Sequence, residues 1–204
     1  MPSGWVNERK REYYYRKAKS ENFRSRASYK LFQAVKKYEF IKPGYIILDI
    51  GASPGGWTQA ALQLVEETGF VLAVDIKPII PFDAINTLTL TGDITDPKTL
   101  KDIQKFLPSQ PDVVISDISP NVSGIWELDH ARQIDLANHA LNIATLVLKP
   151  RGNFFVKVFQ GDTTKKFVEE TKRNFSFVKL VKPKASRSKS AELYVLGMDF
   201  RKKR

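Results

Sequence analysis

Apolar residues follow two alternating patterns along most of the chain. Short apolar runs of strand length are separated by segments in which apolar residues recur every three or four positions. The short runs predict strands near residues 45–50, 70–75, 87–91, 112–117, 153–158, 176–181 and 193–200. The periodic segments predict helices near 56–67, 97–106, 129–148 and 162–174, after an earlier helix that begins near Ser25 or Ser28. Such alternation forms a parallel sheet through right-handed crossovers, so we predict an α/β fold with helices on both faces of a mostly parallel, seven-stranded sheet.

The connection between the last two predicted strands is an exception. It covers residues 182–191 and contains prolines, serines and basic residues but no helical pattern. About ten residues are too few for a crossover helix, so we expect the last strand to run antiparallel. Ligands of such sheets bind at the edge where the parallel strands end. The basic loop 182–189 is therefore expected to overhang the ligand site.

A glycine-rich stretch, DIGASPGGWTQ at residues 49–59, joins the first strand to the next helix. Glycines let backbone N–H groups approach a ligand, and a helix N-terminus adds positive potential. The fingerprint G-x-G-x-x-G fails at Ser53, and the phosphate loop G-x-x-x-x-G-K-[ST] fails because Trp57 replaces the lysine. A nucleoside without a triphosphate, such as S-adenosylmethionine, fits better, although a purely structural glycine turn is the alternative. The candidate cofactor contacts here are Gly51, Ala52, Pro54, Gly55, Gly56 and Trp57.

Two acidic residues end the following strands. Asp75 closes the run at 70–75, about 24 residues after Gly51, a place and spacing suited to ribose hydroxyls. The alternative is a solvated carboxylate at a strand end. Asp93 ends the next strand and could contact an adenine amino group, although Gly-Asp is also ordinary turn chemistry. We predict that both acids bind the cofactor.

Charged residues also stand where apolar ones are expected. Asp117 ends the fourth strand, and Lys157 lies within the apolar run 154–159, which is expected to be buried on both faces. Burying a lysine without a partner is costly, so its presence indicates a site. Glu192 opens the antiparallel strand at the same edge. Lys30, on the early helix, has the pattern of a solvated lysine.

The two histidines and residues 119–121 carry weaker signals. His130 and His139 fall nine residues apart on one predicted helix, and we interpret neither as a ligand or a base, so no metal site is predicted. Residues 119–121 read Ser-Pro-Asn and lack the second proline and the aromatic residue of the loops with which amino-methyltransferases hold a flipped base. We predict that they form a substrate-side loop.

The amino-acid composition indicates what kind of partner the protein binds. The chain has 204 residues, 42% of them hydrophobic, which suits one α/β domain with a sizeable core. Thirty-three basic and 22 acidic residues give a net charge of +11, which favours a polyanionic partner such as RNA. There is no cysteine, no apolar run of membrane length and no signal-peptide pattern, so we expect a cytoplasmic protein without a membrane partner.

Basic residues gather near the two ends of the chain. Residues 1–26 interleave aromatic and basic residues, which suits stacking on bases and contact with phosphates, although a tail without fixed structure is the alternative for the first dozen. We divide the chain into this segment, a catalytic domain at 27–200 and a basic tail at 201–204. The candidate RNA contacts are Arg24, Arg26, Lys182, Lys184, Arg187 and Lys189.

Five motifs together resemble one family. Residues 28–31, 49–59, 116–121, 155–161 and 190–194 are similar, in order, to the FtsJ/RrmJ family of S-adenosylmethionine-dependent RNA ribose 2′-O-methyltransferases. The resemblance spans about Ser25 to Gly197 and implies a Rossmann-like methyltransferase fold. It also implies a catalytic tetrad of Lys30, Asp117, Lys157 and Glu192, and so assigns Lys30 a role that its pattern alone does not. Ser53, where many relatives carry alanine, is a small departure.

The resemblance further implies a uridine of large-subunit ribosomal RNA as the target, since compact members of the family modify it. Related members modify tRNA anticodon loops, which is the first alternative. A small-molecule methyltransferase and a non-catalytic RNA-binding protein are the others, whereas DNA lacks the 2′-hydroxyl. Lys157 is the candidate base that takes the hydroxyl proton, with the carboxylates orienting its amine and Asp117 also expected to contact the cofactor. We expect a monomer.

Overall fold

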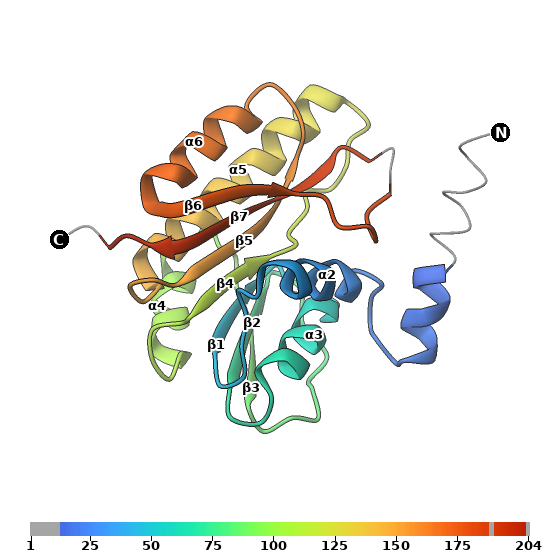
Figure 1. Cartoon of the computed structure of the whole chain (residues 1–204), viewed down its shortest axis with the longest axis vertical. Helices are drawn as coiled ribbons and strands as arrows, with labels where there is room; N and C mark the ends of the chain where they lie inside the picture. The colour runs from blue at the N-terminus through green and yellow to red at the C-terminus, as the bar shows by residue number, and fades with distance from the viewer. Residues whose placement is uncertain (1–12, 188–189, 203–204) are drawn as a thin grey trace.

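A central sheet organises the computed structural model, which describes residues 13–187 and 190–202 (Figure 1). Within these residues the sheet has seven strands in the order β3-β2-β1-β4-β5-β7-β6. The strands are β1 Ile46–Ile50, β2 Phe70–Asp75, β3 Thr87–Thr91, β4 Val113–Ser116, β5 Asn153–Phe159, β6 Phe175–Val181 and β7 Glu192–Phe200. The helices are α2 Ser28–Tyr38, α3 Gly56–Val65, α4 Pro97–Phe106, α5 Trp126–Val147 and α6 Thr164–Asn174, and residues 13–20 are also helical.

The strand directions confirm the predicted fold class. Strands β1 to β5 pair in parallel, with β1 between β2 and β4. β7 is antiparallel to both of its neighbours, β5 and β6. The short connection before β7 allows no crossover, as predicted, and β7 fills the place between β5 and β6. The start of β7 therefore lies at the edge where the parallel strands end.

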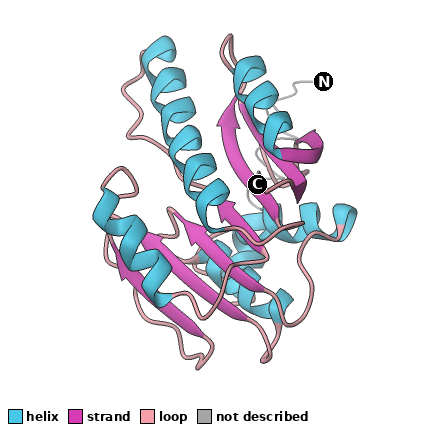
Figure 2. Ribbon diagram, turned by 90° about the vertical axis from the view of Figure 1, so that its left-hand side faces the viewer, coloured by secondary structure: helices cyan, strands magenta, loops and turns pink. Residues whose placement is uncertain are grey.

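Helices cover both faces of the sheet (Figure 2), and an apolar layer lies between the sheet and the helices on each face. One layer contains Leu48, Val114 and Phe154 from the strands and packs against α4, α5 and α6. The other contains Ile47 and Phe155 and packs against α2 and α3. Successive residues of a strand point to opposite faces, so each buried strand must be apolar at almost every position. A charged side chain inside such a strand therefore needs a partner.

Helix α5 begins three residues earlier than predicted. The prediction placed its start at residue 129, whereas the helix runs from Trp126. The first turn carries side chains that face solvent, with Trp126 45% and Leu128 38% exposed, so its residues give no core-facing period. The turn is fixed instead by Asp129, whose carboxylate accepts hydrogen bonds from the N–H groups of Ser123 and Gly124 at 2.7 and 3.1 Å.

The described part of the basic N-terminal segment packs onto the sheet domain. Ala18 forms a small apolar cluster with Tyr29 of α2 and Ala185 of the loop before β7. The backbone N–H of Ala185 donates to Gln33 Oε1 at 3.0 Å. The N-terminal helix and the basic loop thus meet beside α2. None of the helices in the described residues is long and apolar enough to cross a membrane.

Candidate active site

Four charged side chains from four elements meet at the carboxyl edge of the sheet. Lys157 Nζ lies 3.2 Å from Asp117 Oδ1 and donates a hydrogen bond to the Asp117 carbonyl at 2.6 Å. Lys30 Nζ lies 2.7 Å from Glu192 Oε2. Lys30 and Lys157 are only 8% and 5% exposed, so both amino groups are held inside the protein beside carboxylates. We call these four residues the tetrad.

Tyr194 links the two halves of the tetrad. It is fully buried, pairs with Lys157 across the two strands, and its hydroxyl donates to Asp117 Oδ1 at 2.7 Å. Its ring lies below Lys30, with Nζ 5.8 Å from the ring centre. Burial, together with the negative charges of Asp117 and Glu192, raises the pKa of Tyr194 well above its usual value, so the phenol remains a donor.

The charge of Asp117 is set by its neighbours. Burial opposes the ionised form, but the positive charges of Lys157 and Lys30 outweigh it and hold the pKa of this carboxyl below its usual value. The carboxylate therefore stays ionised at neutral pH. Since the carbonyl and carboxylate of Asp117 both engage Lys157 Nζ, two of the positions on that nitrogen are fixed. The third position is left to hold a proton or a lone pair.

The basic loop reaches the tetrad. Ser186 Oγ donates to Glu192 Oε1 at 2.7 Å, so the loop before β7 lies against the start of that strand. This agrees with the predicted overhang of the basic loop. Lys184 and Arg187 belong to the same loop, and Lys182 Nζ donates to the Ser190 carbonyl at 2.8 Å. The predicted contact Lys189 lies outside the described residues.

A cleft of about 510 Å³ opens beside the tetrad. It is lined by the ends of β1, β2, β3 and β4 and by the loop after β4, including Gly51, Ser53, Pro54, Asp75, Asp93, Asp117, Ser119 and Asn121. Asp117 belongs to both the cleft and the tetrad. A ligand in the cleft therefore lies next to Lys157.

The glycine loop shapes the cleft by close packing. Gly51 has φ +74°, and a Cβ there would lie 2.5 Å from Ile118 Cβ. Gly55 has φ +110°, and a Cβ would meet the Phe82 ring at 2.6 Å. Both positions therefore require glycine. A Cβ on Gly56 would lie 2.6 Å from Ser25, and Ala52 is buried with Ala73 and Ile79, so these two support the loop from behind.

Trp57 lies in the core. It is 3% exposed, stacks on Phe155 with ring centres 5.5 Å apart at 9°, and donates from Nε1 to the Ala27 carbonyl at 2.9 Å. The side chain that replaces the phosphate-binding lysine thus ties α3 to α2 and to β5. Its contribution to a cofactor site is to hold the loop in place.

Asp75 and Asp93 bring carboxylates to the cleft. Asp75 Oδ2 accepts a hydrogen bond from Ser53 N at 2.9 Å, which ties the glycine loop to the end of β2. Asp93 accepts from the backbone N–H and hydroxyl of Thr95 at 2.9 and 2.8 Å, and these bonds lower its pKa. Two carboxylate acceptors at neighbouring strand ends fit the hydroxyl and amino donors of a nucleoside.

Arg24 binds the segment that packs behind the glycine loop. Its guanidinium donates to the carbonyls of Ile80 and Pro81 at 2.5 and 2.7 Å and stacks on the Phe82 ring at 3.8 Å. The guanidinium thus contacts the 80–82 segment, which packs behind Gly55. Arg26 stands two residues further on, before α2.

Sequence reasoning missed Gln133 as well as Tyr194. Gln133 is fully buried on α5, and its Nε2 donates to the carbonyls of Lys157 and Ile118 at 3.0 and 3.2 Å. It therefore fixes the backbone of the base-bearing strand relative to the loop after β4. A glutamine among the core positions of α5 was the available signal.

Asp49, at the start of the glycine-rich stretch, is a buried acid with a raised pKa. It is fully buried; Oδ2 accepts from Thr58 Oγ1 at 2.7 Å, and Oδ1 has no partner among the described residues. Burial raises its pKa to about 7, the hydrogen bond from Thr58 opposes this, and the charges of Asp117 and Asp75 add to it. The carboxyl therefore titrates near neutral pH.

Asp49 should make stability depend on pH. Its folded pKa of about 7 lies above the usual value of 3.8 for an aspartate, so the stabilisation from its proton is complete below pH 4 and is lost as pH rises through 7. Between pH 5 and 8 the free energy of unfolding should fall by roughly 2–3 kcal/mol more in the native protein than in Asp49→Asn. Urea unfolding of both proteins at several pH values checks this. Parallel pH profiles would contradict it.

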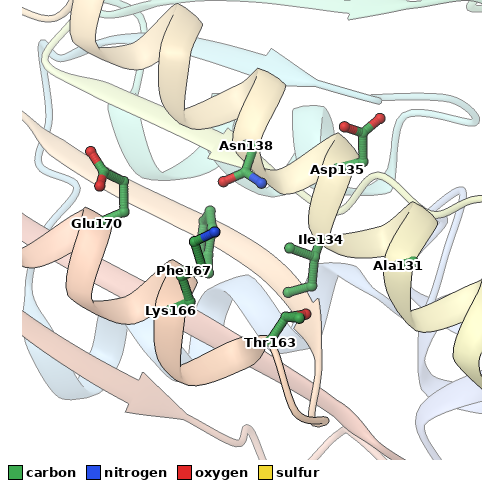
Figure 3. Close-up of a pocket in the computed structure, with 8 residues that line it drawn as sticks. All are labelled: Ala131, Ile134, Asp135, Asn138, Thr163, Lys166, Phe167 and Glu170. Atoms are coloured by element: carbon green, nitrogen blue, oxygen red, sulfur yellow. The ribbon is translucent and has the colours of Figure 1, made fainter.

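A second hollow, of about 320 Å³, lies between α5 and α6 (Figure 3). Its walls come from the two helices, with Phe167 and Ile134 inside and Asp135, Lys166 and Glu170 at the rim. No residue of the tetrad or of the glycine loop lines it, among those the structure describes. The first cleft is therefore the candidate catalytic site.

The histidines do not form a metal centre with other residues of the described ranges, where no group of three His, Cys, Asp or Glu side chains is placed to hold an ion. Sequence reasoning overlooked Asp135, four residues before His139, whose Oδ2 lies 3.9 Å from Nε2. Both side chains are exposed, so this pair is a surface contact.

Known proteins are similar to this chain in sequence. The profile of the FtsJ-like methyltransferase family matches residues 23–200. The chain is 48% identical over 199 residues to the ribosomal RNA large subunit methyltransferase E of Methanocaldococcus jannaschii, covering 96% of this chain and 81% of the relative. It is also 48% identical over 203 residues to the protein of the same name from Methanothermobacter thermautotrophicus, covering 100% and 96%.

The fold is shared with a solved structure as well. A crystal structure of a ribosomal RNA methyltransferase from Plasmodium falciparum is similar with a TM-score of 0.78 at 27% identity, over 87% of this chain and 98% of that one. The profile match covers far more than half of the chain. It includes every tetrad residue and the two other carboxylates of the cleft, Asp75 and Asp93. The chain therefore belongs to the FtsJ-like methyltransferase family.

Proposed function

We propose that this enzyme transfers a methyl group from S-adenosylmethionine to a ribose 2′-hydroxyl of large-subunit ribosomal RNA, at a uridine. The observation that carries the proposal is the position of Asp117, which lines the cleft and binds Lys157 Nζ. Asp117 therefore borders both the cleft that would hold a nucleoside cofactor and the buried amine of Lys157. The names of both relatives support the ribosomal RNA target.

The residues of the cleft fit the cofactor. Asp75 and Asp93 offer carboxylate oxygens to ribose and adenine donors, and the glycine loop leaves room for close approach. S-adenosylmethionine supplies a sulfonium methyl group that an oxygen nucleophile can accept. No carboxylate other than Asp117 belongs to both the cleft lining and the tetrad, within the described residues.

Lys157 serves as the base in this proposal. The hydroxyl oxygen forms its bond to the methyl carbon as the carbon–sulfur bond breaks, and the hydroxyl proton passes to the lone pair of Lys157 Nζ, which acts in its unprotonated form. Asp117 contacts Lys157 Nζ through both its carboxylate and its carbonyl, so the remaining position on that nitrogen has a fixed direction. A positioned base contributes roughly 10²–10⁴-fold, and correct placement of the two reactants contributes more. Lys30 and Glu192 form an ion pair beside Lys157 and complete the tetrad.

RNA is the acceptor best supported by charge. The chain carries +11, and the loop that contains Lys184 and Arg187 touches the tetrad through Ser186. A small-molecule methyltransferase has no need for such a loop, and a non-catalytic RNA-binding protein has no need for a buried lysine. The tRNA alternative shares every feature of the site and is separated by experiment.

A transfer assay with radiolabelled S-adenosylmethionine tests the proposal. The enzyme is incubated with separated large-subunit ribosomal RNA, small-subunit ribosomal RNA and tRNA, as free RNA and as ribosomal subunits. We expect label in the large-subunit fraction, with RNA binding that weakens steeply as salt rises because phosphate contacts release counterions. Label in tRNA alone would favour the alternative substrate, and transfer to no RNA would contradict the proposal.

A further inference from the structure

An exposed aromatic side chain stands at the entrance to the site. Trp126, the first residue of α5, is 45% exposed, and its loop neighbours Val122 and Ile125 are 71% and 59% exposed. Apolar side chains of this size normally lie inside the protein. The core of the sheet does not use Trp126, since the α5 residues in the apolar layer begin at Ile134. Packing of the core therefore gives no reason for a tryptophan here.

Two other rings hold Trp126 in a fixed orientation. Its ring stacks on His130 with centres 5.9 Å apart at 19°, and on Phe159 with centres 6.1 Å apart at 25°. His130 is 7% exposed, and its Nε2 lies 2.8 Å from Thr163 Oγ1. A Cβ on Gly161 would lie 2.7 Å from the His130 ring, so glycine lets this ring lie against the backbone.

The loop that carries Trp126 is fixed as well. Asp129 is 3% exposed, and its carboxylate accepts hydrogen bonds from Ser123 N, Ser123 Oγ and Gly124 N at 2.7, 2.8 and 3.1 Å. An exposed ring held in place in this way loses little side-chain freedom when it binds a partner. The exposed aromatic face is therefore pre-organised for a flat ligand.

The ring stack adjoins the tetrad. Phe159 lies two residues after Lys157 on β5, so the two side chains leave the same face of the strand. Phe159 also pairs with Glu192 across the sheet. On its other side, the Trp126 loop begins at Asp117, which binds Lys157. The aromatic face therefore lies beside the place where the acceptor ribose must enter.

We propose that Trp126, backed by His130 and Phe159, is a stacking platform for a nucleobase of the RNA, close to the methylated ribose. The inference rests on the proposed RNA substrate and adds a residue that positions it. A planar base matches a fixed aromatic face, whereas the sugar-phosphate backbone is met by the basic loop. Base–aromatic stacking tolerates any base, so the platform orients the RNA without selecting its sequence.

Three substitutions separate stacking from other effects. Trp126→Ala should raise the KM for RNA roughly 10- to 100-fold, while the Kd for S-adenosylmethionine stays within about twofold. Trp126→Phe should restore most of the loss, and Trp126→Leu, which keeps apolar area but no aromatic face, should not. The salt dependence of RNA binding should keep its slope in all three, because stacking releases no counterions.

Phe106→Ala is the matched control. Phe106 is 41% exposed at the end of α4, which leads to the start of β4 and so lies at the opposite edge of the sheet. This variant should behave as the native protein. Addition of RNA should also quench tryptophan fluorescence more in the native protein than in Trp126→Phe; both proteins keep Trp5 and the buried Trp57, so the difference between them reports on Trp126.

The outcomes are distinguishable. If Trp126→Ala or Trp126→Leu keeps the native KM for RNA while the native enzyme methylates RNA, the platform is overturned and the proposed function stands. If the native enzyme methylates no RNA, both are overturned. A loss of cofactor affinity equal to the loss of RNA affinity would show a structural role for Trp126 and would also overturn the platform.

Discussion

Replacing Lys157 with alanine should lower the rate of methyl transfer by roughly 10²–10⁴-fold while the affinity for S-adenosylmethionine changes only a few-fold. The reason is the position of Nζ, which is held 3.2 Å from Asp117 Oδ1 at the boundary of the cofactor cleft. Removing it takes away the proton acceptor but none of the groups at the ends of β2 and β3. Single-turnover rates and equilibrium binding of the cofactor measure the two effects separately.

Loss of Lys157 also leaves Asp117 buried without its main partner, which costs stability as well as activity. Lys157→Met, with a side chain of similar length, limits that effect, and thermal unfolding checks the fold of both variants. Lys179→Ala serves as the control because Lys179 is exposed on β6. A rate close to native would rule out Lys157 as the base. Equal losses of activity and of cofactor affinity would instead indicate a structural role.

Replacing Asp75 with alanine should weaken the binding of S-adenosylmethionine roughly 10- to 100-fold. A charged carboxylate that binds hydroxyl groups contributes about 1.5–3 kcal/mol per hydrogen bond. The substitution also removes the acceptor for Ser53 N, at 2.9 Å, and so frees the glycine loop from β2. Isothermal titration calorimetry with cofactor or its demethylated product gives the change directly.

Asp83→Ala is the control for Asp75→Ala, since Asp83 is an exposed acid in the loop that follows β2. It keeps the same change of charge without touching the cleft. If Asp75→Ala binds the cofactor normally but binds RNA poorly, the cleft and the acceptor site have been assigned the wrong way round. Equal effects of the two substitutions would mean that net charge alone controls binding.

Most of the fold could be predicted because local patterns carry it. The alternation of strand-length runs and helical periods fixed every strand, and the short connection after β6 fixed the direction of β7. The insertion of β7 between β5 and β6 could not be predicted, because it depends on pairing between distant strands rather than on any local signal. The first turn of α5 was missed because Trp126 and Leu128 face solvent.

The residues of the site also differ in how far the sequence could predict their roles. Lys157 was predictable because a lysine interrupts a run of buried apolar residues, and the structure pairs it with Asp117. Tyr194 was not, since a tyrosine in a buried strand looks like any core residue until its hydroxyl is placed 2.7 Å from Asp117. Arg24 looked like an RNA contact by charge, whereas its guanidinium binds the backbone carbonyls of Ile80 and Pro81.

The chemical nature of the new bond shows whether the enzyme methylates a ribose 2′-hydroxyl. Large-subunit ribosomal RNA methylated by the enzyme with labelled cofactor is hydrolysed in alkali, which cleaves only next to a free 2′-hydroxyl. We expect the label in an alkali-resistant dinucleotide, and we expect no label when the target nucleotide carries a 2′-deoxyribose. Label recovered in single nucleotides, on a base, would contradict this expectation.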